Sequence, residues 1–238
     1  MDEIQSQMTS LRLPGMARCW QTLLETRQTS ELSLADGLQI LLHAEQEHKS
    51  SSRNERLIKK AKFRYQASYE ELVYRPERGL DKALLTSLAT GTYINEGRAV
   101  IITGAAGTGK SFVASALGNK ACRLGYKVLY FNMQKISEKF KVARLEGTHI
   151  RLFDKLAKTD LIILDDFGLT KLEKQQQSDL MEIIEDRHGR RSTIIVSQIP
   201  VRNWFEIISN ENIADAFLDR LVHTSYRFEL KGESMRKK

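Results

Sequence analysis

Eight consecutive residues of the sequence have the types and the spacing that bind a phosphate chain. The segment Gly104-Ala105-Ala106-Gly107-Thr108-Gly109-Lys110-Ser111 fits the pattern G-x-x-x-x-G-K-[ST] at every fixed position. Glycines let backbone N–H groups close around phosphate oxygens, and the N-terminus of a following helix adds favourable partial charge. Lys110 would reach the β- and γ-phosphates, and the Ser111 hydroxyl would bind Mg²⁺. We therefore predict a site for ATP and Mg²⁺ that extends to Phe112; the plainer alternative is a glycine-rich turn.

A pair of carboxylates follows a second apolar run. Leu161-Ile162-Ile163-Leu164 leads directly into Asp165 and Asp166, at the carboxyl end of a predicted buried strand, where open α/β sheets bind their ligands. We predict that Asp165 holds Mg²⁺ and that Asp166 orients and deprotonates an attacking water, which gives hydrolysis rather than transfer. The plainer alternative is an acid pair that only caps the end of the strand.

The elements that must position these groups are visible as a change in the sequence near residue 80. Beyond it, short apolar runs alternate with helical stretches, at residues 99–103, 127–131, 161–164, 193–196 and 226–230. Near-continuous apolar strands separated by helices are typical of a parallel sheet with both faces covered. The predicted fold class is therefore α/β, with a doubly wound domain of five parallel strands over residues 76–238.

Residues 1–75 are predicted to form a small helical domain that binds DNA or a partner. Pro14 suits the first turn of one helix, and a second helix is predicted to begin near Ser33. Residues 53–65 contain six cations and one acid, with two aromatic residues among them. The stretch 74–79 is predicted to be a linker.

Composition narrows the class of protein. No apolar run approaches the length of a membrane span, and the opening residues lack the layout of a secretory signal, so we expect a cytoplasmic protein with no membrane partner. Cys19 and Cys122 are far apart and have no C-x-x-C partners, which favours reduced thiols. His43 and His48 are five positions apart and would face different sides of a helix, so no metal beyond Mg²⁺ is expected.

Several motifs together resemble a known family. The phosphate loop combined with Leu161–Gly168 resembles AAA+ ATPases of the DnaC/IstB group. Two C-terminal runs, Ile213–Leu221 and Lys231–Arg236, sharpen the likeness. With the opening Leu11–Met16 they make nearly the whole chain similar to the IstB family, the helper ATPases of bacterial insertion-sequence transposition.

The resemblance implies roles for further residues. Ser197 and Gln198 take the sensor 1 place, where a polar side chain probes the γ-phosphate or its water, although Asn is common there and Gln198 departs from it. Arg220 matches the arginine finger that a neighbouring subunit inserts beside the γ-phosphate, which implies a homo-oligomer. The plainer alternative pairs Arg220 with an acid of its own helix. Arg236 resembles a sensor 2 arginine, and the chain ends two residues later, so no C-terminal lid is expected.

The net charge of +7 has the sign expected of a protein that binds a polyanion. The helicase-loader relatives carry an extra helix facing a central channel, and this resemblance points to the basic stretch 138–145. The candidate DNA-contacting residues are Arg53, Arg56, Lys59, Lys60, Lys62, Arg64, Lys139, Lys141 and Arg144. They would contact phosphates, so binding should tolerate any sequence and weaken with salt. The plainer alternative is a solvated cationic helix face.

The function implied is that of an ATP-dependent helper that oligomerises on double-stranded target DNA and recruits or stimulates an integrase-type transposase. A replicative helicase loader of the DnaC type is the main alternative. A small-molecule kinase that shares only the phosphate loop is a third, but it explains neither Asp166 nor Arg220.

Overall fold

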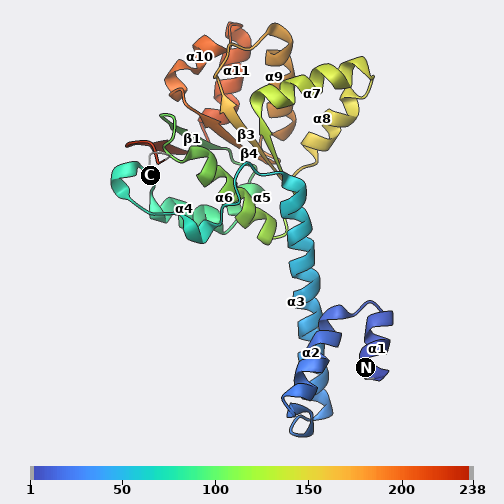
Figure 1. Ribbon diagram of the computed structural model, residues 1–238. Helices are drawn as coiled ribbons and strands as arrows, with labels where there is room; N and C mark the ends of the chain where they lie inside the picture. Colours follow the sequence, from blue (N-terminus) through green and yellow to red (C-terminus); the bar gives the residue numbers. More distant parts are fainter. Residues whose placement is uncertain (1–2, 236–238) are drawn as a thin grey trace. The chain divides into compact units, whose positions relative to one another are not determined.

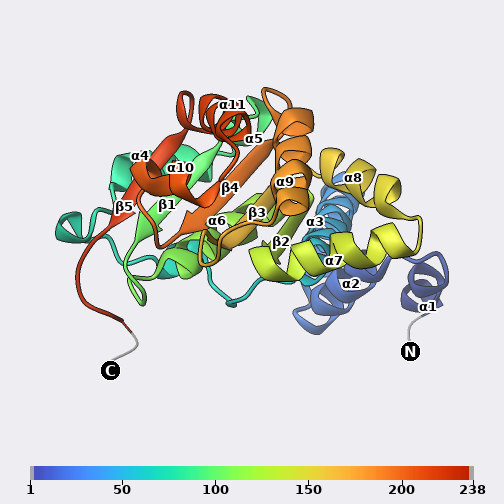
Figure 2. The same ribbon diagram turned by 90° about the horizontal axis from the view of Figure 1, so that it is seen from above.

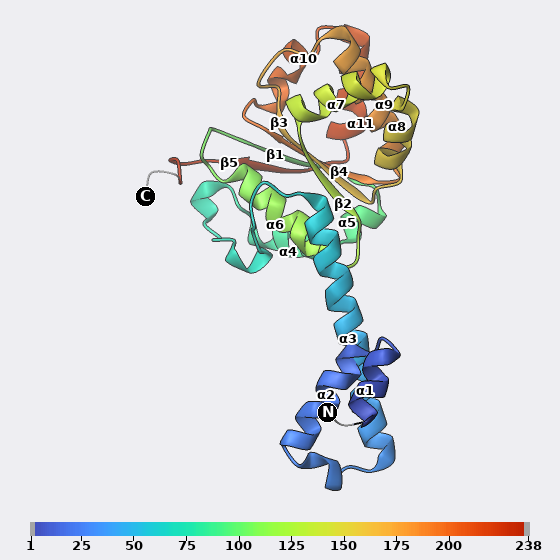
Figure 3. The ribbon, with the colours of Figure 1, turned by 45° about the vertical axis from the view of Figure 1, so that its right-hand side comes forward.

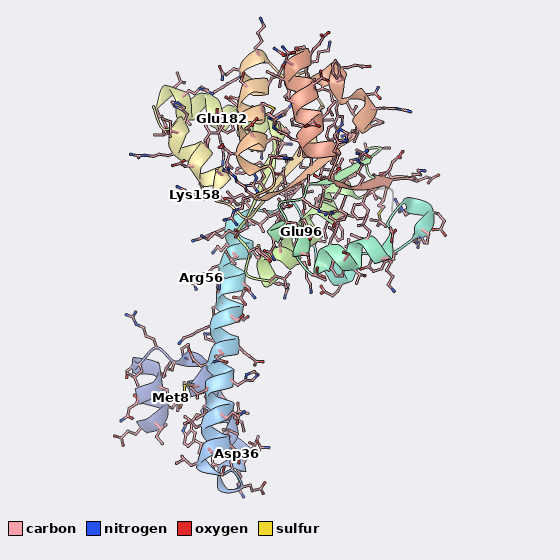
Figure 4. The ribbon with its side chains drawn as sticks, turned by 180° about the vertical axis from the view of Figure 1, so that it is seen from behind. Met8, Asp36, Arg56, Glu96, Lys158 and Glu182 are labelled. Atoms are coloured by element: carbon pink, nitrogen blue, oxygen red, sulfur yellow. The ribbon has the colours of Figure 1, made fainter. Side chains whose placement is uncertain are left out.

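The computed structural model describes residues 3–235, which form two compact units divided between Arg56 and Leu57. Helix α3 (Leu34–Ala61) runs through this division without a break, and Arg56 is labelled on it in Figure 4. The predicted division at 75–76 lies later in the chain. The difference arises because aromatic side chains that follow α3, among them Phe63 and Tyr65, pack against the core of the second unit.

The first unit is helical, as predicted. Its elements are α1 (Glu3–Ser10), α2 (Pro14–Glu25), the short η1 (Gln28–Ser30) and the first part of α3. Pro14 is the first residue of α2. The buried carboxylate of Glu45 on α3 accepts the backbone N–H groups of Gly15 at 2.7 Å and of Met16 at 3.0 Å, so a negative charge caps the N-terminus of α2. A Cβ at Gly15 would lie 2.6 Å from the carbonyl oxygen of Ala44, so this helix contact requires glycine.

The second unit contains a five-stranded sheet. The strands are β1 (Val100–Gly104), β2 (Val128–Asn132), β3 (Leu161–Phe167), β4 (Ser192–Ser197) and β5 (Tyr226–Leu230), in the order β2-β3-β4-β1-β5. All adjacent pairs are parallel, which confirms the predicted fold class. In a parallel sheet the carboxyl ends of all strands meet at one edge, so loops after different strands come together there.

Helices cover both faces of this sheet (Figures 1 and 2). On one side lie α4 (Lys82–Ala89), α5 (Thr92–Asn95) and α6 (Lys110–Arg123), with η2 (Tyr69–Glu71) and η3 (Pro76–Arg78) before them in the chain. On the other lie α7 (Met133–Leu145), α8 (His149–Ala157), α9 (Lys174–Arg187), α10 (Trp204–Ile207) and α11 (Glu211–Val222), with η4 (Val201–Asn203) leading into α10. Figure 3 shows the same two layers from another side.

Successive side chains of the central strands pack in two separate hydrophobic cores, one on each face of the sheet. Ile102 belongs to the cluster beneath α6, whereas its neighbour Ile101 belongs to the cluster beneath α9 and α11, and both are essentially inaccessible to solvent. This two-sided burial explains why the strands are nearly continuous apolar runs. Among residues 3–235, no helix combines the length and the apolar character that crossing a membrane requires.

Candidate nucleotide-binding site

The loop between β1 and α6 has a backbone suited to an anion. Gly104, Gly107 and Gly109 have φ angles of 146°, 82° and 96°, values that residues with a side chain rarely adopt. Helix α6 begins at Lys110 with Gly109 as its N-cap, and no side chain caps this end. The backbone N–H groups of the first turn, and the positive end of the helix dipole, therefore face the loop without a competing side-chain acceptor at the cap.

The two functional side chains of the loop lie where phosphate and metal chemistry needs them. Lys110 is only 7% exposed, and its Nζ donates to the carbonyl oxygen of Ala105 at 2.7 Å, which keeps the ammonium inside the loop. Ser111 is the second residue of the same helix, and its Oγ donates to Oδ1 of Asp165 at 3.1 Å. The structure thus brings together the loop and the carboxylate that the sequence analysis paired.

Both carboxylates lie at an irregular point of β3. The pairing of β3 with β4 shifts register between Leu164 and Phe167, and Asp166 has a φ of 61°. A non-glycine residue in this left-handed region costs on the order of 1 kcal/mol and persists only where its surroundings hold it. The Asp165 side chain is fully buried and that of Asp166 is 18% exposed. The irregularity therefore leaves one carboxylate in the interior and turns the next toward the solvent.

Three side chains that the sequence analysis did not assign to this site hold the two carboxylates. Arg64 NH1 lies 3.3 Å from Oδ2 of Asp165 and 2.9 Å from Oδ2 of Asp166. The Tyr130 hydroxyl donates to Asp165, and Nδ2 of Asn132 donates to Asp166 at 2.7 Å. Tyr130 and Asn132 belong to β2, the strand beside β3, so the sheet itself brings these donors to the carboxylates.

The sequence held a signal for one of these three residues. Asn132 is a polar residue at the carboxyl end of a strand, the place where side chains from adjacent parallel strands converge. Tyr130 lies within an apolar run and gave no such signal. Arg64 was predicted to contact DNA, which stays a prediction; the structure places its guanidinium against Asp165 and Asp166.

Charge and burial set the protonation states of these donors. Partial burial lowers the pKa of Arg64, but the negative charges of Asp166 and Asp165 raise it by more, so the guanidinium stays charged. Burial, followed by the charge of Asp165, raises the pKa of Tyr130 well above its usual range. The Tyr130 hydroxyl therefore remains a hydrogen-bond donor to the buried carboxylate at all ordinary pH values.

The predicted sensor 1 residues lie beside the carboxylates. Ser197 is fully buried at the end of β4, where its Oγ donates to the carbonyl oxygen of Phe167 at 2.8 Å and accepts the N–H of Ile199 at 3.0 Å. Gln198 is the next residue and is partly exposed. Ser197 thus fixes the backbone that follows Asp166, and Gln198 has the freer side chain of the two.

Arg220 lies at the opposite end of the sheet. It lines a small cavity together with Ala99 and Thr193, which are at the amino ends of β1 and β4. Its guanidinium pairs with Glu185 at 3.0 Å, and its side chain is 27% exposed. The acid partner therefore comes from α9, not from α11 itself. Arg220 does not reach the phosphate loop of its own chain, which lies at the carboxyl ends of the strands.

The C-terminal run crosses the phosphate loop. The backbone N–H of Met235 donates to the carbonyl oxygen of Gly107 at 2.9 Å. A Cβ built on Gly107 would lie 2.1 Å from Oγ of Ser234, so the loop and the run are in direct contact. Arg236 is the next residue and lies outside the described residues.

The remaining DNA candidates fall into two groups. On α7, Arg144 pairs with the carboxylate of Asp179 on α9, which is almost fully buried; its predicted contact with DNA stays a prediction. Lys141 forms exposed pairs with Glu138 at 3.4 Å and with Glu173 at 3.9 Å. Lys139 and Lys141 stay predictions, as do those at the end of α3 or just after it: Arg53, Arg56, Lys59, Lys60 and Lys62.

Comparison with known proteins agrees with this geometry. Residues 6–238 match the model of a family described as IstB-like ATP binding protein. The chain is 44% identical to an insertion sequence ATP-binding protein of Sinorhizobium fredii, over 97% of this chain and 94% of that protein. It is 41% identical to the ATP-binding protein of insertion sequence IS1162 from Pseudomonas fluorescens, over 82% and 85% of the two chains.

Solved structures with the same fold are more distant in sequence. The DnaC helicase loader superposes with a TM-score of 0.54 at 20% identity, covering 66% of this chain and 94% of that one. DnaI superposes with a TM-score of 0.59 at 14% identity, covering 74% and 94%. Both support the architecture of the sheet and its helices.

Proposed function

The chain belongs to the family of IstB-like ATP binding proteins, and from this premise we propose that it is a Mg²⁺-dependent ATPase that assists the transposition of an insertion sequence. One observation carries the proposal: Ser111, beside Lys110 at the end of the loop, donates to the carboxylate of Asp165, which also accepts the backbone N–H of Asp166. Hydroxyl and carboxylate oxygens are ligands that suit Mg²⁺, which usually takes one or two carboxylates and completes its shell with water and phosphate oxygens.

The residues of the site divide the chemistry of hydrolysis among them. Lys110 would exchange the carbonyl of Ala105 for the β- and γ-phosphates, while Ser111 and Asp165 would hold Mg²⁺, which neutralises charge on the phosphate oxygens. Asp166 would orient a water molecule and accept its proton as the water oxygen attacks the γ-phosphorus and the bond to the bridging oxygen breaks. Tyr130 and Asn132 keep the two carboxylates in place, and Gln198 would contact the γ-phosphate or its water.

A second copy of the chain would complete the site. Arg220 lies at the end of the sheet away from its own phosphate loop, so we propose that it acts as an arginine finger on the ATP of a neighbour. ATP would then sit between subunits and favour a homo-oligomer. Arg236 follows a residue that is bonded to the phosphate loop, which supports its proposed role as a sensor 2 arginine.

The proposed substrate of the assembly is double-stranded DNA in the cytoplasm, and its proposed partner is a transposase of the integrase type. Cations at the end of α3 and on α7 would bind phosphates without reading sequence. The family and the relatives named for insertion sequences favour this role over helicase loading. A transposition assay with the neighbouring transposase, beside a helicase-loading assay, separates the two.

The first experiment is ATP hydrolysis with and without duplex DNA. We expect the wild type to hydrolyse ATP, and we expect DNA to stimulate hydrolysis less as the salt concentration rises. Lys110→Ala should lose about a hundredfold or more in rate, because the substitution removes the positive charge that would stabilise the transferring phosphate. Lys171→Ala, which changes an exposed lysine, should behave as the wild type. Hydrolysis by Lys110→Ala at the wild-type rate would refute the proposal.

A further inference from the structure

Arg64 lies against the two carboxylates that the proposed site needs for Mg²⁺ and for the attacking water. Its NH1 group lies within 3.3 Å of both Asp165 and Asp166, and its bond to Asp165 is made to the same carboxylate whose other oxygen accepts Ser111. We infer that Arg64 is a latch: it neutralises the two carboxylates in the nucleotide-free protein, and it must leave them before Mg²⁺ and ATP can bind. This inference rests on the proposed function.

The residues on either side of Arg64 are both packed against other parts of the second unit. Phe63 packs edge-on against Tyr130, with ring centroids 6.3 Å apart, and lies so close to Gly118 that an added Cβ there would be 2.5 Å from its ring. Tyr65 contacts Phe112, which follows the phosphate loop, at 6.3 Å between centroids. Arg64 is therefore delivered to the carboxylates by fixed neighbours.

The side chain itself is nonetheless able to leave. It is 40% exposed, whereas Asp165 is fully buried, so the guanidinium can exchange its partners for water while the carboxylate cannot. Two adjacent carboxylates, one of them buried, need a cation beside them. Arg64 supplies one positive charge on the Oδ2 side of Asp165, and Mg²⁺ held by Ser111 and the Oδ1 side would bring two more to the same carboxylate. Repulsion between the two cations would therefore set binding of the metal against closure of the latch.

The latch would connect the nucleotide state to helix α3. Arg64 lies three residues after Ala61, the last residue of α3, and the chain turns sharply at Lys62, which has a φ of 57°. Release of Arg64 would free one of the side chains that fix this turn. We therefore expect the C-terminal end of α3 to be held most firmly in the absence of nucleotide.

The test measures binding of a fluorescent, non-hydrolysable ATP analogue while MgCl₂ is titrated. Arg64→Gln should lower the Mg²⁺ concentration for half-maximal binding by about tenfold, equivalent to about 1.4 kcal/mol, because the competing cation is gone. Arg64→Lys keeps one charge but loses the planar fork, and its requirement should fall between those of Arg64→Gln and the wild type. Arg202→Gln, the matched loss of an exposed arginine on η4, should need as much Mg²⁺ as the wild type.

Thermal unfolding supplies a second readout. Without Mg²⁺, Arg64→Gln should unfold at a lower temperature than the wild type, and Mg²⁺ with the analogue should raise its midpoint by more. An unchanged or increased Mg²⁺ requirement in Arg64→Gln would overturn the latch, and an increase would mean that Arg64 contacts the bound nucleotide. If Arg64→Gln does not fold, Arg64→Lys decides by the same criterion. Failure of the wild type to bind the analogue, or equal binding by Lys110→Ala, would instead refute the proposed function.

Discussion

The two ends of the sheet both bury charge, but they treat it differently. At the amino end, Arg187 is 1% exposed and donates to the carbonyl oxygens of Leu156, Thr159 and Ser192 and to the hydroxyl of Thr193. At the carboxyl end, buried Asp165 and its neighbour Asp166 are balanced by Arg64, which is 40% exposed. One charge is satisfied by fixed backbone groups and the other by a side chain that can leave.

This difference separates a structural charge from a functional one. All the N–H groups of the Arg187 guanidinium donate to acceptors of its own chain, so none is left to bind a ligand. These hydrogen bonds connect α9 to the amino ends of β3 and β4. Asp165 and Asp166 are neutralised by the movable side chain of Arg64, which Mg²⁺ would replace. Strain follows the same division, since the left-handed Asp166 lies at the carboxyl end.

The largest expected effect on ATP hydrolysis comes from Arg220. This residue lies at the amino end of its own sheet and would act at the carboxyl end of the sheet of a neighbouring subunit. Arg220→Ala should reduce ATP hydrolysis by about a thousandfold, because an arginine finger stabilises charge that develops in the transition state. Nucleotide binding at the unchanged loop should persist. Hydrolysis is measured by phosphate release, with Arg202→Ala as the control for loss of an exposed arginine.

Mixing two inactive variants tests whether Arg220 acts on a neighbour. Arg220→Ala retains an intact loop and Lys110→Ala retains an intact finger. Random assembly should place the two side by side at about a quarter of the interfaces, and activity should return to that extent. Full activity of Arg220→Ala alone would show that each end of the sheet works without the other.

The next effect should appear in stability at the amino end. Arg187→Met fills a similar volume but leaves several buried acceptors without a donor, so the free energy of unfolding should fall by about 3–4 kcal/mol. Arg191→Met removes a partly exposed pair with Asp160 and should cost less than about 1 kcal/mol. Urea unfolding followed by circular dichroism measures both, and equal losses would contradict the assignment of Arg187 as the fixed charge.

The features of the fold and of the site that depend on local sequence could be predicted. The five strands follow from apolar runs, and the loop from Gly104 to Ser111 follows from glycines at fixed spacing. The helical nature of the first unit was also predicted. These features depend on neighbours along the chain, where periodicity and conformational preference are directly visible.

The parts that depend on distant segments could not. Arg64 reaches Asp165 because the chain turns at Lys62 and because Phe63 finds a place beside Gly118, and neither event is encoded in the spacing of the cations. The boundary was placed at residue 75 for the same reason, since the aromatic residues after α3 are core residues only once α6 is beside them. Arg144 looked equally free until α9 supplied Asp179.

A smaller effect should distinguish two buried tyrosines. Tyr130→Phe removes a donor from the buried carboxylate of Asp165, so the free energy of unfolding should fall by about 1–2 kcal/mol. Tyr93 lies on α5 just before β1, and its buried hydroxyl finds no hydrogen-bond partner among residues 3–235. Tyr93→Phe should therefore be neutral or slightly stabilising, because it removes an unsatisfied polar group. The same urea titration measures both, and a larger loss in Tyr93→Phe would reverse the contrast.

The smallest expected effect is the reactivity of a buried thiol, which reports how often the amino end of the sheet opens to solvent. Cys122 lies in the last turn of α6 with no exposed surface, and burial raises the pKa of its thiol to about 12. The reactive species is the thiolate, so at pH 8 a disulfide reagent should modify Cys19, which is partly exposed, and spare Cys122. Cys19→Ser should consume no reagent until denaturant is added, and rapid reaction of this variant would show that the amino end opens.

The raised pKa of Cys122 also predicts a dependence of stability on pH. Because the folded pKa lies above the unfolded value, burial of the protonated thiol contributes fully to the free energy of unfolding below about pH 9, and this contribution is lost as the pH rises toward 12. The free energy of unfolding should therefore decline over that interval more steeply in the wild type than in Cys122→Ala.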